Sequence, residues 1–336
     1  MLFRDEMLRA KEWRTAVPLK WRCTRENWIK WTTRTRSAIS KIPVFEISNV
    51  ADYFYLSTDQ EYWDLFTDFP RPMPPFEDMW LEFVLPSKTL SEGSVNPLPA
   101  REDFKRVGCH LSCIDTERFS PADRKMKETS GMNPEVRYIL NAGIYLEGHD
   151  KLVANICYVA FGITVAGDPI PFMAKGQKLS YVFPGADGAL AGDKECAEVM
   201  TELGKQSCSF LYVAMLAMSL VNCRNVSTRT VRSPEKLIAK HARNGVAVTA
   251  EHHVIEIQPM IRSVQAVTAE SGYSRRAAAV VRGHFTDYSE GKGLFGQHKG
   301  MFWWHQRSGG IAAKVEYRLK HAVGGLDSKW ATPEKA

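Results

Sequence analysis

The sequence predicts an α+β fold, built largely on antiparallel sheet, with a buried central helix and a basic helical arm at the N terminus. Two observations predict the sheet and the helix. Apolar, β-rich runs separated by Gly and Pro recur between residues 78 and 182, and a long, mostly apolar helical segment follows at about 193–222. A third observation predicts the arm, because residues 1–41 combine an excess of cations with four of the nine tryptophans.

Length and composition are those of a globular protein. A chain of 336 residues can bury a substantial core and fits one or two domains. No apolar run approaches the roughly 18 residues of a membrane-spanning helix, and the acid-containing start does not resemble a secretory signal. Seven cysteines suggest no disulfide framework. We therefore expect a cytoplasmic protein that does not enter a membrane.

Residues 1–41 are expected to form a basic, tryptophan-rich helical arm, followed by an α+β domain over residues 42–336. The arm holds eleven Lys and Arg against four Asp and Glu, a net charge of +7, when the whole chain carries +6. Helices are expected at about 4–16 and 25–40, on either side of Pro18. The rest of the chain is thus close to neutral, so the positive charge, which permits an anionic partner without requiring one, is concentrated in the arm.

The second helix of the arm is a candidate for nucleic-acid binding. Trp28 and Trp31 share one face of it, whereas Lys30, Arg34 and Arg36 spread around the others. Phosphates would meet the cations, and unpaired bases could stack on the rings. Two alternatives remain open: an arm that docks by its tryptophans and leaves its charges in solvent, and a surface for a protein partner.

The region between the arm and the long helix predicts mainly strands. They are expected at 43–58, 78–86, 104–117, 136–148 and 151–167. A loop rich in Ser, Pro and Gly at 87–102 is a possible boundary within the domain, and the polar segment 121–135 is expected to be a second loop. Alternation along a strand would turn Cys109 and Cys113 towards the core and His110 away from them. We therefore predict no metal site and no cofactor.

The segment at 193–222 predicts the central helix because its later half is apolar nearly all round. A strand at 223–231 follows, and Ser233-Pro234 is expected to begin a further helix. That helix carries Lys236, Lys240, His241 and Arg243. Another strand begins at Glu251.

The most unusual stretch spans residues 282–307, with three histidines, two adjacent tryptophans and five glycines. Residues 291–296 match G-x-G-x-x-G, but no helix or kinase catalytic loop follows, so we expect a tight hairpin loop. Adjacent strand positions point to opposite faces. At most one of Trp303 and Trp304 should therefore be exposed.

Three strings in this region resemble a C-terminal signature of uncharacterised phage- and plasmid-encoded proteins. They are Val281-Arg282-Gly283-His284-Phe285, then Gly293-Leu294-Phe295-Gly296, then Phe302-Trp303-Trp304. In that signature an R-G-H-[FW] run precedes a Gly-rich turn and a tryptophan-bearing strand. The resemblance covers roughly the last 130 residues. It implies an accessory protein of a mobile element, and it transfers no activity or catalytic residue.

We predict a phage or plasmid accessory protein that binds nucleic acid through a basic-aromatic surface. The predicted contacts are Lys30, Arg34, Arg36, Arg275, Arg276, Arg282, Lys292, Lys299, Trp303, Trp304 and Arg307. Two alternatives remain. One is a hydrolase or nuclease in which Asp287 orients His284 as a general base and a hairpin brings His305 close. The other is a protein that binds and inhibits a host or phage factor through the same surface.

Overall fold

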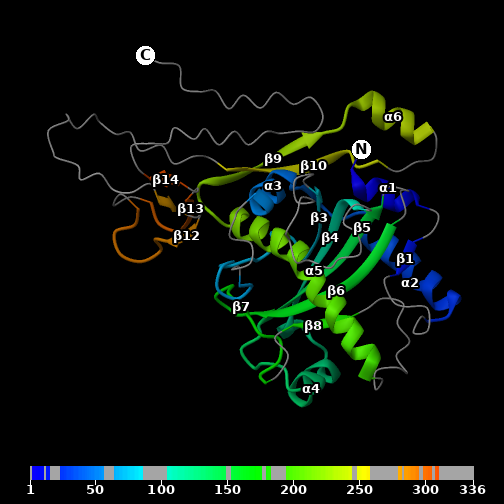
Figure 1. Ribbon diagram of the computed structural model, residues 1–336, viewed down its shortest axis with the longest axis horizontal. Helices are drawn as coiled ribbons and strands as arrows, with labels where there is room; N and C mark the ends of the chain where they lie inside the picture. Colours follow the sequence, from blue (N-terminus) through cyan, green and yellow to red (C-terminus); the bar gives the residue numbers. More distant parts are fainter. Residues whose placement is uncertain are drawn as a thin grey trace.

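The structure is a computed structural model, and it confirms the α+β class. It describes residues 2–10, 13–15, 23–56, 64–85, 104–148, 153–175, 179–182, 194–243, 248–257, 279–281, 284–294, 298–304 and 307–309. Within these residues, ten strands form one mixed sheet with helices on both faces, and four more strands form two small two-stranded sheets (Figure 1). The predicted boundary at 87–102 lies outside the described residues.

The large sheet has the order β1-β6-β5-β4-β3-β2-β10-β9, and β7 and β8 also pair with β6. Its strands are β1 (Trp13–Thr15), β2 (Val44–Glu46), β3 (Asp78–Val84), β4 (Phe104–Asp115), β5 (Tyr138–Gly148), β6 (Val153–Ile163), β7 (Pro169–Ile170), β8 (Ser180–Val182), β9 (Val226–Arg232) and β10 (Glu251–Ile257). The long central pairs are antiparallel, as predicted. Three short pairs are parallel: β1 with β6, β2 with β3 and β10 with β2. The sheet is therefore mixed rather than purely antiparallel.

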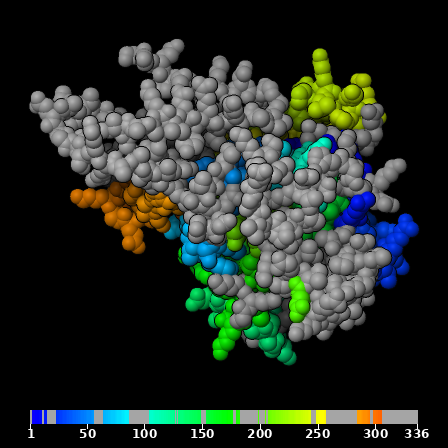
Figure 2. Space-filling model, viewed as in Figure 1, coloured from blue at the N-terminus to red at the C-terminus, as the bar shows by residue number. Residues whose placement is uncertain are grey.

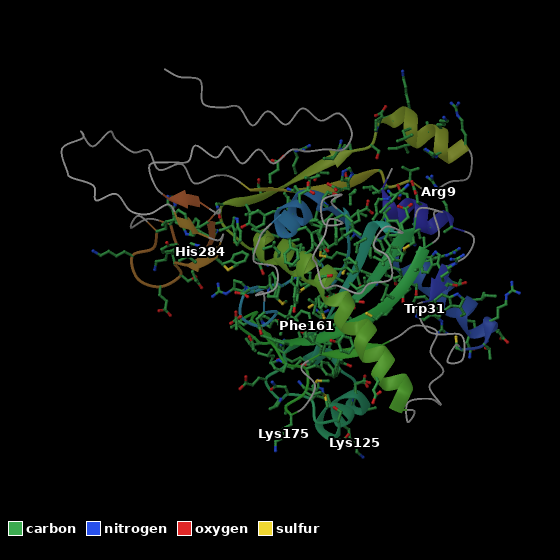
Figure 3. All side chains as sticks on the ribbon, viewed as in Figure 1. Arg9, Trp31, Lys125, Phe161, Lys175 and His284 are labelled. Carbon is green, nitrogen blue, oxygen red and sulfur yellow. The ribbon has the colours of Figure 1, made fainter. Side chains whose placement is uncertain are left out.

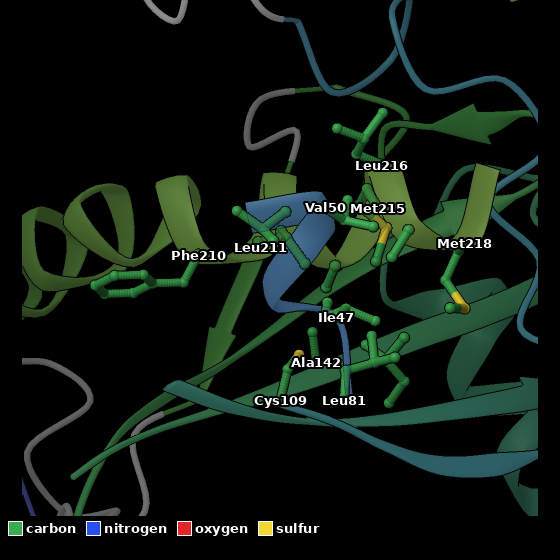
Figure 4. Close-up of a cluster of buried hydrophobic side chains, with 14 of the residues drawn as sticks. Ile47, Val50, Leu81, Cys109, Ala142, Phe210, Leu211, Met215, Leu216 and Met218 are labelled. Carbon is green, nitrogen blue, oxygen red and sulfur yellow. The ribbon is translucent and has the colours of Figure 1, made fainter. Parts of the chain in front are cut away.

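The predicted central helix is confirmed as α5 (Lys194–Val221), which crosses one face of the sheet (Figure 1). It packs on β4, β5 and β6, and Met215 and Leu211 of its later half belong to the same buried cluster as Leu81 and Cys109 (Figure 4). The helix α3 (Ser48–Leu56) packs beside it on the same core. Burial of apolar area on this scale is the main favourable contribution to folding.

The cysteines in β4 are packing residues, as their alternation predicts. Cys109 is fully buried and Cys113 is half-buried, and both are free thiols. Burial raises the pKa of Cys113 to about 11 and raises that of Cys109 further, so both thiols stay protonated at neutral pH. No group of three or more potential metal ligands occurs among the described residues.

The other face of the sheet is covered by α1 (Phe3–Arg9) and α2 (Arg25–Ile39). Trp80 and Tyr145 point to this face because their strand neighbours Leu81 and Ile144 point to α5. Phe3 and Trp13 pack against them, with ring centroids 6.2 Å and 5.8 Å from Trp80 and Tyr145 respectively. The N-terminal region thus contributes two helices and one strand to the folded body.

Three predicted elements differ in the structure. The first helix ends at Arg9 rather than near residue 16, and residues 13–15 form β1 because Trp13 is buried and their backbone pairs with β6. The expected strand at 43–58 becomes β2 followed by α3, because the buried Val50, Ala51 and Phe54 recur at helical spacing.

The third difference is α4 (Pro121–Thr129), where a loop was expected. The Ser120 hydroxyl accepts a hydrogen bond from the Asp123 backbone N–H, and the Asp123 carboxylate accepts one from the Ser120 hydroxyl at 2.6 Å. Pro121 occupies the first position of the helix. These local start signals, rather than an apolar face, account for a helix in a polar segment.

The predicted C-terminal hairpin is confirmed as β12 (His284–Asp287) paired with β13 (Met301–Trp304), next to β11 (Ala279–Val281) paired with β14 (Arg307–Gly309). Trp303 is 1% exposed whereas Trp304 is half-exposed, as alternation predicts. Gly293 has a φ of +77°, and a Cβ there would lie 2.7 Å from the His298 carbonyl oxygen, so the turn requires glycine.

Two further features complete the described fold. The helix α6 (Glu235–Arg243) connects β9 to β10 at the end of their antiparallel ribbon. None of the helices in the described part of the chain combines the length and the apolar character that crossing a membrane requires.

Candidate nucleic-acid interface

The aromatic face of α2 is turned towards the sheet. Trp28 and Trp31 stack with ring centroids 4.9 Å apart, and Trp31 meets Trp13 and Tyr158 edge-on at 6.2 Å and 6.3 Å (Figure 3). The Trp28 Nε1 donates a hydrogen bond to the Trp13 carbonyl at 3.0 Å. These rings therefore hold the helix in place, and each uses one face to stack on the other.

The opposite face of α2 carries exposed cations. We call Arg25, Lys30, Arg34 and Lys41 the α2 cations; Lys41 lies just beyond the helix, and all four are exposed. Lys30 and Arg34 are four residues apart and share a face. Lys30 lies 2.6 Å from Glu26, but both side chains are well exposed, so this ion pair contributes little to stability. Arg25, Arg34 and Lys41 form no ion pair with any residue that the structure describes.

Arg36 has a different role from Arg34, although both were predicted to contact nucleic acid. Its guanidinium lies 5.0 Å from the centroid of the Trp13 ring and donates to the Ala10 carbonyl at 2.5 Å. Burial lowers the pKa of Arg36. This side chain therefore fastens α2 to the sheet side and is not presented to solvent with the α2 cations.

A buried polar network lies under α1 and joins segments far apart in the sequence. Arg4 donates to the Ile42 carbonyl at 2.6 Å, beyond the end of α2, and to the Thr249 hydroxyl at 2.5 Å, before β10. Asp5 accepts hydrogen bonds from the backbone N–H and the hydroxyl of Thr249 at 3.1 Å and 2.5 Å. The segment that follows α2 and the segment that precedes β10 are thus both hydrogen-bonded to α1.

Glu82 anchors the start of α1 from the sheet. Its carboxylate accepts hydrogen bonds from the backbone N–H groups of Phe3 and Arg4 at 2.8 Å and 2.9 Å, and from Trp80 Nε1 at 3.0 Å. Burial raises the pKa of Glu82 to about 7 in spite of these donors. The group therefore titrates in the neutral range.

α6 presents a second row of cations. Lys236, Lys240 and Arg243 follow the spacing i, i+4, i+7 and lie on one face, and no residue of α6 is buried. We call these three the α6 cations. The Ser233 hydroxyl donates to the Thr249 carbonyl at 2.9 Å, so the helix begins against the network under α1. These cations were not among the predicted contacts, although their i, i+4, i+7 spacing is visible in the sequence.

The hairpin β12–β13 is fixed to the end of α5. Asn225 Nδ2 donates to the Trp303 carbonyl at 2.9 Å, and Asn225 Oδ1 accepts from the Trp303 N–H at 3.0 Å. The backbone N–H of Arg224 donates to the Met301 carbonyl at 2.8 Å. The Trp303 ring packs against Phe285 and Tyr53 at 4.5 Å and 5.6 Å. Trp303 is therefore a core residue of the hairpin.

Asp287 and His284 line a groove of about 550 Å³ between the hairpin, residues 67–71 and the turn at Asp168. The lining of the groove includes three carboxylates and one arginine, so the groove is acidic. They are Asp68, Asp168, Asp287 and Arg71. His284 lies on the hairpin side of the groove (Figure 3). An acidic groove repels phosphates rather than binding them.

Asp287 does not orient His284 as the enzyme alternative expects. Its carboxylate accepts hydrogen bonds from the Ser289 hydroxyl at 2.5 Å, the Ser289 backbone N–H at 2.8 Å and Arg71 at 2.8 Å. Ser289, together with Arg71, holds the pKa of Asp287 below its usual value. His284 is three positions away on the same strand, and the hydrogen bonds described for Asp287 go to Ser289 and Arg71 instead. His305 lies outside the described residues.

The remaining predicted contacts divide into two groups. Lys292 and Lys299 are exposed on the hairpin, whose residues 284–304 also include Asp287 and Glu290, so the positive charge of the two lysines is balanced by two carboxylates. Arg275, Arg276 and Arg282 lie outside the described part of the chain. The backbone of Arg307 is described, but its side chain is not.

No protein-family model, curated protein or solved structure matches this chain. Its function is therefore inferred from the geometry of its own residues. Two exposed rows of cations, on α2 and α6, are the described features that best fit a polyanionic ligand.

Proposed function

We propose that the protein binds nucleic acid by its phosphate backbone, with the α2 cations as the contact surface. The observation that supports this is the orientation of α2, whose tryptophans face the sheet and whose cations face solvent. Phosphate contacts of this kind release condensed counterions, and that release drives binding. The surface is held rigidly because Arg36 and the ring contacts fix the helix.

The proposed contact surface consists of cations alone and does not include the aromatic rings of α2. A helix rises about 1.5 Å per residue, so Lys30 and Arg34 lie about 6 Å apart along the axis, and each can meet a separate phosphate. Glu26 is the one carboxylate on this helix. Base stacking on Trp28 or Trp31 is not part of the proposal, because their rings pack against each other and against Trp13 and Tyr158.

The geometry supports the enzyme and protein-binding alternatives less well than it supports nucleic-acid binding. The enzyme alternative needs a base oriented by Asp287, and the hydrogen bonds of Asp287 go to Ser289 and Arg71. The mobile-element context and the binding of a host protein stay predictions.

The proposal is tested by fluorescence anisotropy with labelled nucleic acid over a salt series. The double variant Lys30→Ala, Arg34→Ala removes two phosphate contacts, so the slope of log K against log salt should fall by about 1.8. The matched control is Lys125→Ala, Lys175→Ala, which removes the same charge from exposed sites away from α2 (Figure 3).

Binding that weakens in the α2 variant and not in the control supports the proposal. Equal losses in both variants would show that only net charge matters, and the assignment to α2 would be abandoned. Absence of salt-dependent binding by the wild-type protein would overturn nucleic-acid binding itself.

A further inference from the structure

α6 stands apart from the folded body in a way that α2 does not. It lies at the tip of the β9–β10 ribbon and forms a projecting knob at the edge of the molecule (Figure 1, Figure 2). None of its residues is buried, and Leu237 is 38% exposed. A nine-residue helix gains little stability from its own hydrogen bonds, and most helices of this length depend on a packed face. These are the features of a helix that packs against a separate binding partner.

The charge on α6 identifies the chemistry of that partner. Lys236, Lys240 and Arg243 form one row along the helix, and Glu235 at its first position is its one carboxylate. Arg232, which precedes the helix, lies 3.8 Å from Glu251, an exposed and loose pair. A polyanion complements this row, and a polyanion is also the ligand proposed for the α2 cations.

The aromatic residues distinguish a double-stranded ligand from a single-stranded one. Proteins that hold single strands combine a basic groove with exposed rings on which bases stack. Among the described residues, Phe76 is the one aromatic side chain that is largely exposed, at 42%, and its ring packs near Phe45 and His253. The rings beside the α2 cations are packed, and α6 has none. Cations without a stacking surface suit a duplex, whose bases are already stacked.

The dimensions of α6 match the major groove of B-form DNA. Nine residues span about 13.5 Å, and the major groove is about 12 Å wide and admits a helix. The deep, narrow major groove of A-form RNA does not admit one. The network under α1 ties the base of α6 and the end of α2 to Arg4, so both rows of cations belong to one edge of the molecule (Figure 1).

We propose that the ligand is duplex DNA and that α6 enters its major groove while the α2 cations hold phosphates of the same duplex. This inference rests on the proposed function, because it names the form of nucleic acid and adds a second contact element. The α6 cations then contact phosphates along the groove, and Leu237 lies at the level of the base edges.

The test compares three probes of the same sequence: a 20-base-pair DNA duplex, one of its strands, and the corresponding RNA duplex. Their affinities are measured by anisotropy for the wild-type protein and for the triple variant Lys236→Ala, Lys240→Ala, Arg243→Ala. Alanine favours helix, so this variant keeps α6. The control variant is Lys105→Ala, Lys125→Ala, Lys175→Ala, which removes the same charge from exposed positions elsewhere.

We expect the wild-type protein to bind the DNA duplex at least about tenfold more tightly than the other two probes. The α6 variant should lose that preference, and its salt slope on duplex DNA should fall by about 2.7. Duplex binding equal to wild type in the α6 variant, or a preference for the single strand or the RNA duplex, would overturn the inference. If the α2 variant alone weakens binding, the proposed function stands and this inference fails; if no probe binds, both fail.

Discussion

The outer faces of α2 and α6 carry exposed cations on one side of the molecule, and the groove beside the β12–β13 hairpin carries aspartates on the other (Figure 1). Both regions contain tryptophans next to charged residues in the sequence. In α2 the tryptophans face the sheet and leave cations in solvent. In the hairpin Trp303 forms the floor, and Asp68, Asp168 and Asp287 outnumber the single Arg71 around it.

The difference shows that tertiary packing decides what a basic-aromatic sequence presents to a ligand. Trp28 and Trp303 each belong to a stretch that suggests base stacking, and each is used to fix its element to the core. The charges are then sorted by what surrounds them, because Arg34 faces water while Arg71 is paired with Asp287 at 2.8 Å. α2 and α6 therefore present positive charge to a ligand, and not aromatic rings.

The largest expected effect concerns the floor of the groove. Trp303→Ala should lower the free energy of unfolding by about 3–5 kcal/mol, because a fully buried ring and its contacts are lost. Trp304→Ala, at the half-exposed neighbouring position, should cost clearly less. Urea unfolding of both variants measures this. An equal loss of unfolding free energy in the two variants would mean that Trp303 is no more a core residue than Trp304, and would contradict its role in the hairpin.

The second expected effect concerns the network beneath the basic edge. The folded-state pKa of Glu82 is raised from 4.5 to about 7, so its favourable contribution is fully present below pH 4.5 and is lost as the pH rises towards 7. The free energy of unfolding should fall by up to about 3 kcal/mol across that window and then level off.

Glu82→Gln removes the titrating group and should flatten this part of the profile of unfolding free energy against pH. The measurement is urea unfolding of both proteins at several pH values between 4 and 8. If the two profiles fall in parallel, Glu82 is not the group responsible, and α1 is held independently of its protonation.

A third prediction separates two arginines of the same helix. Arg36→Ala should lower the free energy of unfolding by about 1–2 kcal/mol, because it removes a hydrogen bond to Ala10 and a contact with the Trp13 ring. Arg34→Ala should change stability by less than about 0.5 kcal/mol and should weaken DNA binding instead. Thermal unfolding and anisotropy on both variants give the two readouts, and the reverse assignment would contradict the orientation of α2.

The smallest expected effect concerns Asp287. Asp287→Asn should change the free energy of unfolding by less than about 1 kcal/mol, because the pair with Arg71 is about 40% exposed on both sides and is screened by water. It should leave the affinity for DNA unchanged. A large loss of affinity in this variant would show that the groove, and not the basic edge, contacts the ligand.

The sequence predicts the elements whose patterns are long and apolar. The strands β3 to β6 and the helix α5 follow from runs such as Leu140–Leu146 and Phe210–Leu220, because only burial accounts for so many apolar residues in succession. α4 was missed because its start depends on Ser120 and Asp123 rather than on an apolar face. β1 was missed because three residues become a strand only when β6 offers its edge.

The candidate site was predictable by residue type and not by orientation. Lys30, Arg34 and Arg36 were all predicted as contacts. Lys30 and Arg34 are exposed, whereas Arg36, two residues further on, lies against Trp13, a residue from another element. The α6 cations share their spacing with the α2 cations. The sequence does not show that no residue of α6 is buried in the described fold, because this follows only from the structure.

Lysine footprinting shows which of the two regions contacts DNA, because it reports on both in one sample. The protein is acetylated with and without a 20-base-pair DNA duplex, and the modified lysines are quantified by mass spectrometry. We expect DNA to protect Lys30, Lys236 and Lys240, while Lys292 and Lys299 on the hairpin loop keep their reactivity. Protection of the hairpin lysines with no change on α2 and α6 would contradict it.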